Sequence, residues 1–150
     1  NGSDSSMFDN TLELLVLAGR PIDVYNQGDM RRDFTYIDDI AEAVVRLTEV
    51  IPQRNPEWTV ETGTPAESSA PYRVYNIGNS QPVQLTEFIH QLEQALGVTA
   101  QMNLLPMQPG DVLETSADTS ALEAAIGFKP RTDLQLGLKQ FVAWYRGYYI

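Results

Sequence analysis

The chain has 150 residues, no cysteine and a formal net charge of −10 at pH 7. This length is enough for a folded domain with a substantial core, and the absence of cysteine excludes disulfides and zinc–thiolate sites and suits a reducing, cytoplasmic location. The negative charge argues against nucleic acid or an anionic membrane as a partner, and no apolar run approaches the roughly 20 residues that a membrane-spanning helix needs.

The N-terminal region predicts a leader, a helix and a strand. Residues 1–6 have the composition of a flexible leader, and we expect residues 7–150 to form a single domain. Apolar residues recur at helical spacing over residues 7–18, and Gly19 follows where a helix would end. Residues 22–26, with the sequence IDVYN, then predict a short strand.

The next predicted helix should bury one apolar face. Its apolar residues recur at helical spacing: Ile37, Ile40, Ala41, Val44 and Val45. Asp38 and Asp39 fall in its first turn, where carboxylates favour the helix dipole, so we interpret them as structural residues and not as metal ligands. Residues 52–72 lack periodicity and predict a long loop.

The second half of the chain alternates strands with helices. Strands are predicted at residues 73–79 and 101–105, and helices at residues 85–96, 120–126 and from about residue 134, after a capping-box spacing between Thr132 and Gln135. Gly97 and Gly127 stand where the first two of these helices should end. The alternation predicts an α/β fold, with α+β as the alternative.

The cations are few and are mostly arginine. Arginine accounts for eight of the ten Lys and Arg residues, and its planar guanidinium can hold a phosphate with two hydrogen bonds. Arg31 and Arg32 stand together before Asp33 and the predicted helix. This pair is the strongest candidate for an anion contact that the residues offer. His90, the only histidine, falls beside the apolar stripe of its helix, so we expect it to face solvent.

Six segments resemble one family in the order in which they occur: PIDVYN, RRDFTYIDDI, NPEW, APYRVYNIGN, PMQPGD and GFKPRTDL. They are similar to the C-terminal half of nucleotide-sugar epimerases and dehydratases, which are extended short-chain dehydrogenases. The resemblance is greatest to the UDP-glucuronate 4-epimerase branch, which includes proteins of capsular polysaccharide biosynthesis. It implies that the chain is the C-terminal substrate-binding part of such an enzyme, with the Rossmann NAD-binding half missing.

Two motifs of that family have no counterpart in the chain. No G-x-x-G-x-x-G phosphate loop follows a predicted strand, and none of the seven tyrosines has a lysine four residues later, as the family's catalytic Y-x-x-x-K pair requires. We therefore expect no catalytic residue, no bound cofactor and no metal on this chain. NAD and the N-terminal Rossmann half would belong to the parent enzyme, for which the resemblance also allows a homodimer.

The resemblance assigns contacts with a UDP-sugar to seven positions: Val24, Tyr25, Asn26, Arg32, Asn76, Gln108 and Asp111. Arg32 would bind the diphosphate, Asn76 the sugar nucleotide and Asp111 the ribose hydroxyls. Gln108 stands where many relatives have a second arginine, and a neutral amide is a weaker ligand for an anion.

Residues 24–26 would form a strand that cradles the base and ribose. Each assignment has a structural alternative, since Arg32 could pair with a nearby carboxylate at the surface, Asn76 could complete a turn, and Asp111 could simply end one.

The implied reaction is the interconversion of UDP-glucuronate and UDP-galacturonate by oxidation and re-reduction at C4, with the fragment alone inactive. Two alternatives stay open. One is another reaction of the same superfamily, that of a 4,6-dehydratase, a decarboxylase or an epimerase of an uncharged hexose. The other is a non-catalytic binding or assembly module.

Overall fold

A computed structural model describes residues 16–149. The chain divides into two compact units: unit 1 comprises residues 1–32, 82–115 and 133–150, and unit 2 comprises residues 33–81 and 116–132. That the two together form the single predicted domain stays a prediction. The predicted leader and most of the predicted helix 7–18 lie outside the described residues, although Val16 and Leu17 are helical.

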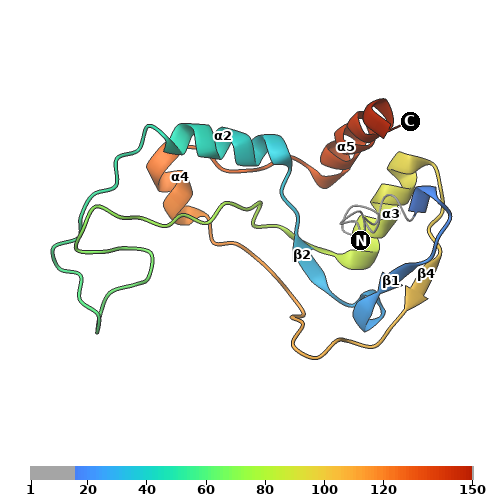
Figure 1. Ribbon diagram of the computed structural model, residues 1–150, viewed down its shortest axis with the longest axis horizontal. Coiled ribbons are helices and arrows are strands. Elements are labelled where there is room, and N and C mark those ends of the chain that lie inside the picture. The colour runs from blue at the N-terminus through green and yellow to red at the C-terminus, as the bar shows by residue number, and fades with distance from the viewer. Residues whose placement is uncertain (1–15, 150) are drawn as a thin grey trace, which may run out of the picture. The chain divides into compact units, whose positions relative to one another are not determined.

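Unit 1 holds most of the strands and two long helices. Its elements are β1 (Ile22–Val24), the short 3-10 helix η2 (Tyr25–Gly28), β2 (Arg31–Asp33, whose last residue begins unit 2), β3 (Pro82–Gln84), α3 (Leu85–Leu96), β4 (Met102–Leu104) and α5 (Leu134–Tyr149). β1 pairs in parallel with β4, so that Ile22 lies opposite Met102, and β2 pairs with β3. The β1–β4 pair is visible beside α3 in Figure 1.

The ends of the helices follow from local chemistry. Gly97 and Gly127 adopt left-handed conformations directly after α3 and α4, with φ of 72° and 62°, which confirms the predicted ends. The residue that caps the start of α5 differs from the prediction. The Asp133 carboxylate, and not Thr132, accepts the backbone N–H of Gln135 at 2.9 Å, because it stands immediately before the first helical residue.

The apolar core of unit 1 forms where α3, α5 and β1 meet. Its buried members are Val16, Ile22, Val24, Ile89, Leu92, Leu96, Ala100, Leu138 and Val142. The residues from α3 and α5 recur at helical spacing, so each helix turns one apolar face inward. This core confirms the apolar stripe predicted for residues 85–96.

Unit 2 is built around two helices, α2 (Ile37–Leu47) and α4 (Ser120–Ile126), which lie side by side in Figure 1. The predicted helices are confirmed. The predicted core face of α2 is wrong in part, because Ile37, Val44 and Val45 are 67%, 48% and 62% exposed.

Residues 52–72 contain neither a helix nor a strand, and hydrogen bonds within this segment and to its flank hold it. The Trp58 indole donates to the carbonyl of Thr64 at 3.0 Å, and the Asn55 amide donates to the Glu67 carboxylate at 2.9 Å. Glu67 also forms an ion pair with Arg73.

Two predicted strands differ from the structure. The strand predicted at 22–26 ends at Val24, because Asn26 and Gln27 take positive φ angles of 48° and 54° in η2 and cannot continue a strand. The strand predicted at 73–79 is absent apart from one bridge between Glu67 and Arg73, since no neighbouring segment of the described chain pairs with it. No helix within residues 16–149 is long and apolar enough to cross a membrane.

The core predicts a clear difference between two leucines of unit 1. Leu92 is fully buried in α3 and Leu104 is 55% exposed in β4. Leu92→Ala should lower the free energy of unfolding by about 2–5 kcal/mol, measured by urea denaturation. The same substitution at Leu104 is the control and should cost under about 1 kcal/mol. Equal losses at both positions would contradict this location of the core.

Candidate functional site

Arg32 is held by three acceptors within unit 1. One guanidinium nitrogen donates to the carbonyl of Arg31 at 3.0 Å and, more weakly, to that of Leu113 at 3.4 Å. The other terminal nitrogen donates to the Asp111 carboxylate at 3.0 Å. A guanidinium has five N–H groups, so these three acceptors leave two N–H groups without a partner among the described residues. With a side chain 25% exposed, Arg32 can still present donors to an anion.

The segment that carries Asp111 runs alongside β2. The backbone N–H of Arg31 donates to the carbonyl of Leu113 at 2.8 Å, and the N–H of Thr115 donates to the carbonyl of Arg31 at 3.1 Å. These bonds form a parallel bridge between Arg31 and Glu114, whose side chains also pair at 3.3 Å. These backbone hydrogen bonds therefore set the spacing of Arg32 and Asp111, independently of the hydrogen bond between their side chains.

Gln108 and Asp111 belong to the turn before that segment. The N–H of Asp111 donates to the carbonyl of Gln108 at 3.2 Å, and Gly110 at φ 86° allows the chain to reverse. The Asp111 carboxylate also accepts the N–H of Val112 at 2.8 Å. The structure thus brings Arg32 and Asp111 together and leaves the Gln108 side chain exposed. Their contacts with a ligand stay predictions.

Residues 24–26 offer fewer groups for binding a ligand than the sequence implied. Val24 is 1% exposed and belongs to the core, and its carbonyl already accepts the N–H of Leu105 at 3.0 Å. The Asn26 side chain donates to the carbonyl of Asp29 at 2.7 Å. Tyr25 and Asn26 therefore form a tight turn after the strand, and the expectation of a strand that presents its edge to a base is wrong at these two residues.

Asn76 lies in unit 2. Its amide donates to the carbonyl of Asp118 at 3.4 Å, a long and weak bond, so the side chain has capacity left for another partner. The pKa of the Asp118 carboxyl lies below its usual value because the hydroxyl and then the N–H of Ser120 donate to it.

Asp33 connects two segments of unit 2, a role that the sequence did not reveal. Its carboxylate accepts the N–H groups of Ser80 at 2.9 Å, Gln81 at 3.3 Å and Ala117 at 3.2 Å. Three backbone donors on one carboxylate make a strong local constraint. Only its position after Arg32 in the R-D-F motif could have drawn attention to it.

The acidic pair at the start of α2 is structural. The Asp39 carboxylate accepts the N–H groups of Arg131 at 3.0 Å and Thr132 at 2.8 Å. Partial burial raises the pKa of the Tyr36 hydroxyl, and the neighbouring Asp38 carboxylate raises it further.

Within residues 16–149, no group of three or more acidic or histidine side chains could hold a metal ion. His90 is exposed, as predicted.

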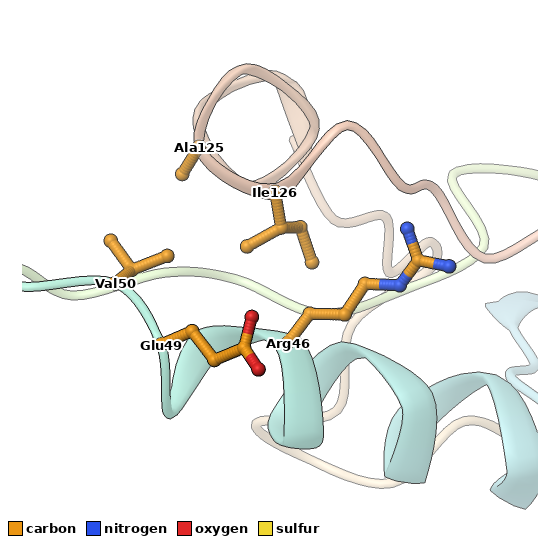
Figure 2. A pocket seen from close by; sticks show the side chains of 5 residues that line it. All are labelled: Arg46, Glu49, Val50, Ala125 and Ile126. Atoms are coloured by element: carbon orange, nitrogen blue, oxygen red, sulfur yellow. The ribbon is translucent and has the colours of Figure 1, made fainter.

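A shallow cleft of about 460 Å³ lies within unit 2. Figure 2 shows that the end of α2 and the residues after it form one wall, with Glu49 and Val50, and that α4 forms the other, with Ile126. Arg46 lines it too, but its charge is engaged by the Glu42 carboxylate at 2.6 Å and by the ring of Phe128. The cleft therefore offers no free cation to an anionic ligand.

Comparison with known proteins gives the family. The sequence profile described as "NAD dependent epimerase/dehydratase family" matches residues 2–78, about half of the chain. The chain belongs to the NAD dependent epimerase/dehydratase family. This finding confirms the resemblance drawn from RRDFTYIDDI and its companion motifs.

Curated relatives within the family match most of the chain but extend well beyond it. The "Uncharacterized 37.6 kDa protein in cld 5'region" of Escherichia coli O111:H- is 65% identical over 89% of this chain and 40% of its own length. "Protein CapI" of Staphylococcus aureus is 48% identical over 89% of this chain and 40% of its own length. The "Probable UDP-glucuronate 4-epimerase" of Rhizobium meliloti is 48% identical over 85% of this chain and 38% of its own length. The chain spans about two fifths of these relatives.

Solved structures agree on the fold of extended short-chain dehydrogenases. "MoeE5 in complex with UDP-glucuronic acid and NAD" superposes with a TM-score of 0.72 at 27% identity, over 97% of this chain and 43% of that protein. The dTDP-glucose 4,6-dehydratase of Bacillus anthracis superposes with a TM-score of 0.68 at 18% identity, over 94% of this chain and 40% of that protein. At that identity the likeness concerns the fold alone.

Proposed function

We propose that this chain is the sugar-nucleotide-binding part of an NAD-dependent epimerase that interconverts UDP-glucuronate and UDP-galacturonate by oxidation and re-reduction at C4. The observation that carries the proposal is the 48% identity to a probable UDP-glucuronate 4-epimerase over 85% of the chain. The alternatives within the superfamily, a 4,6-dehydratase or a decarboxylase, have no relative of comparable identity to support them among the proteins compared above.

Arg32 is the proposed diphosphate ligand. Its two remaining N–H groups could each donate a charge-assisted hydrogen bond, worth about 1.5–3 kcal/mol, and Asp111 holds the guanidinium in place at 3.0 Å. Because the chain has a net charge of −10, an anionic ligand requires donors at short range, such as the two N–H groups of this guanidinium. Asp111 would then turn its other oxygen to the ribose hydroxyls, while contacts of Val24, Tyr25, Asn26, Asn76 and Gln108 with the ligand stay predictions.

We expect no NAD site among the described residues 16–149. β3 runs directly into α3 with no glycine between them, and β1 is followed by η2 and not by a long helix, so no described strand leads through a glycine-rich loop to a helix. In the proposed enzyme, the Rossmann half would bind NAD and carry the catalytic pair, and this part would bind and orient the sugar nucleotide in the cytoplasm.

The two adjacent arginines provide a matched pair of variants. Arg32→Ala should weaken UDP binding by about tenfold to a hundredfold, because it removes the proposed diphosphate contact. Arg31→Ala removes the same charge from a side chain that is 50% exposed and paired with Glu114, and should change binding less than threefold. Titration followed by NMR measures both. Equal losses would mean that net charge, and not the Arg32 contact, determines affinity.

A variant of Asp111 distinguishes a contact with the ribose from a role in holding Arg32. Asp111→Ala should weaken UDP by about tenfold, since one lost hydrogen bond costs about 1.4 kcal/mol, and should weaken inorganic diphosphate less, because diphosphate has no ribose for the carboxylate to bind. Calorimetric titration of both ligands measures the ratio. Parallel losses for both ligands would show that Asp111 acts only through Arg32.

Turnover by the full-length protein tests the reaction itself. Given a panel of UDP- and dTDP-sugars with NAD, it should convert UDP-glucuronate to UDP-galacturonate, and the present chain alone should convert none. Formation of a 4-keto-6-deoxy sugar from a dTDP-hexose would establish the dehydratase instead, and loss of CO₂ from UDP-glucuronate would establish a decarboxylase.

A further inference from the structure

Two distant segments of unit 2, residues 76–81 and 116–119, are held together by hydrogen bonds, and we call their contact the junction. The hydroxyl of Ser80 donates to the carbonyl of Ala117 at 2.7 Å and lies 3.0 Å from the hydroxyl oxygen of Thr119. The bonded residues are 37 and 39 positions apart in sequence. Local structure alone would therefore not bring the two segments together.

Asp33 provides the charged group of the junction. Its Oδ2 accepts the backbone N–H of Ser80 at 2.9 Å and that of Ala117 at 3.2 Å, one from each segment, and its Oδ1 accepts that of Gln81 at 3.3 Å. One oxygen therefore binds both segments at once. A hydrogen bond to a charged group is about twice as strong as one between neutral groups, so Asp33 contributes more to the junction than the Ser80 hydroxyl does.

The two segments approach so closely that a side chain at position 78 would not fit. A Cβ atom on Gly78 would lie 2.5 Å from the Cβ of Ala117 and 3.0 Å from Oδ2 of Asp33, whereas carbon atoms pack best at about 3.5–4.0 Å. Gly78 and its neighbour Asn79 are both buried. The junction therefore fixes the path of the backbone through this segment.

Asn76 depends on the junction for its position. Its side chain is exposed, and its hydrogen bond to the carbonyl of Asp118 is 3.4 Å long, which is too weak to hold the amide firmly. The stronger bonds are made by Ser80 and Gln81, further along the same segment. The backbone therefore sets the position of the Asn76 amide, and Asp33 holds that backbone.

We propose that Asp33 is a positioning residue for the sugar nucleotide, because its carboxylate holds the junction and thereby places the Asn76 amide for contact with the ligand. The inference rests on the proposed function, in which Asn76 contacts the sugar nucleotide. Asp33 itself would not touch the ligand, since both of its oxygens already accept backbone N–H groups and its charge repels a phosphate. A binding group that is fixed in advance loses less conformational freedom when the ligand binds.

The first test measures the affinity of the full-length protein for UDP-glucuronate. Asp33→Ala should weaken binding about tenfold, the equivalent of one lost hydrogen bond. Asp33→Asn keeps one acceptor oxygen and should weaken binding about threefold, and it replaces Asp33→Ala in every comparison if that variant does not fold. In an Asn76→Ala background, either substitution should change affinity less than about twofold, since the amide that Asp33 positions is gone. Additive losses in the double variant would overturn the proposal.

Asp39→Ala is the matched control for stability. The Asp39 carboxylate also accepts two backbone N–H groups from a distant segment of unit 2, those of Arg131 and Thr132, but this segment lies outside the junction. Asp33→Ala and Asp39→Ala should both lower the Tm. Measured well below either Tm, Asp39→Ala should leave the affinity for UDP-glucuronate within about twofold of the wild type. Equal losses of affinity at both positions would show that a general loss of stability, and not positioning, weakens binding.

The side-chain amide of Asn76 gives a second readout, which needs no ligand. Its NMR signal, assigned by its absence in Asn76→Ala, should shift or broaden in Asp33→Ala and stay unchanged in Asp39→Ala. An unchanged signal in Asp33→Ala would overturn the proposal. A wild-type protein that does not bind UDP-glucuronate would refute the proposed function instead, and the Asn76 signal would still decide whether Asp33 positions this amide.

Discussion

The candidate site depends on the parallel bridge between β2 and the segment around Glu114. Two backbone hydrogen bonds, from Arg31 to Leu113 and from Thr115 to Arg31, measure 2.8 and 3.1 Å and set the register of the two segments. With that register fixed, a guanidinium on one segment and a carboxylate on the other meet at 3.0 Å. Because the backbone holds the geometry, the side chains lose less conformational freedom when they pair, and the arginine is preorganised.

The same arrangement explains how an acidic protein can hold an anion. At a net charge of −10, the average field repels phosphate, so recognition must come from a few donors at short range. Arg32 suits this role because its charge is delocalised over a rigid fork. Its partner Asp111 neutralises part of that charge and is itself partly exposed, so the pair can exchange contacts with a ligand at modest cost.

Much of the fold could be predicted from the sequence where a regular pattern is reinforced by a local stop signal. The helix of residues 85–96 combines an apolar stripe with Gly97, and both features appear in the structure. The strand at 73–79 could not be judged in this way, because alternation shows that a segment suits a sheet but not whether a neighbour is present to pair with it. The turn at Asn26 was missed because positive φ is uncommon for residues other than glycine.

Of the site, the family motif located Arg32 and Asp111. The three backbone donors on Asp33 come from segments about 50 and 80 residues away in sequence and leave no local signal.

The pairing of β1 with β4 has a consequence for how the protein is made. Asp23 and Asn103 face each other although they are 80 residues apart in sequence, so β1 leaves the ribosome long before its partner strand exists. Contacts this distant in sequence slow folding, because the entropy of closing the intervening loop must be overcome before the contact contributes any stability. During synthesis, the edge of β1 and the apolar side chains of Ile22 and Val24 therefore remain exposed to solvent until β4 is made. Unpaired strand edges and unburied apolar side chains favour aggregation of a nascent chain.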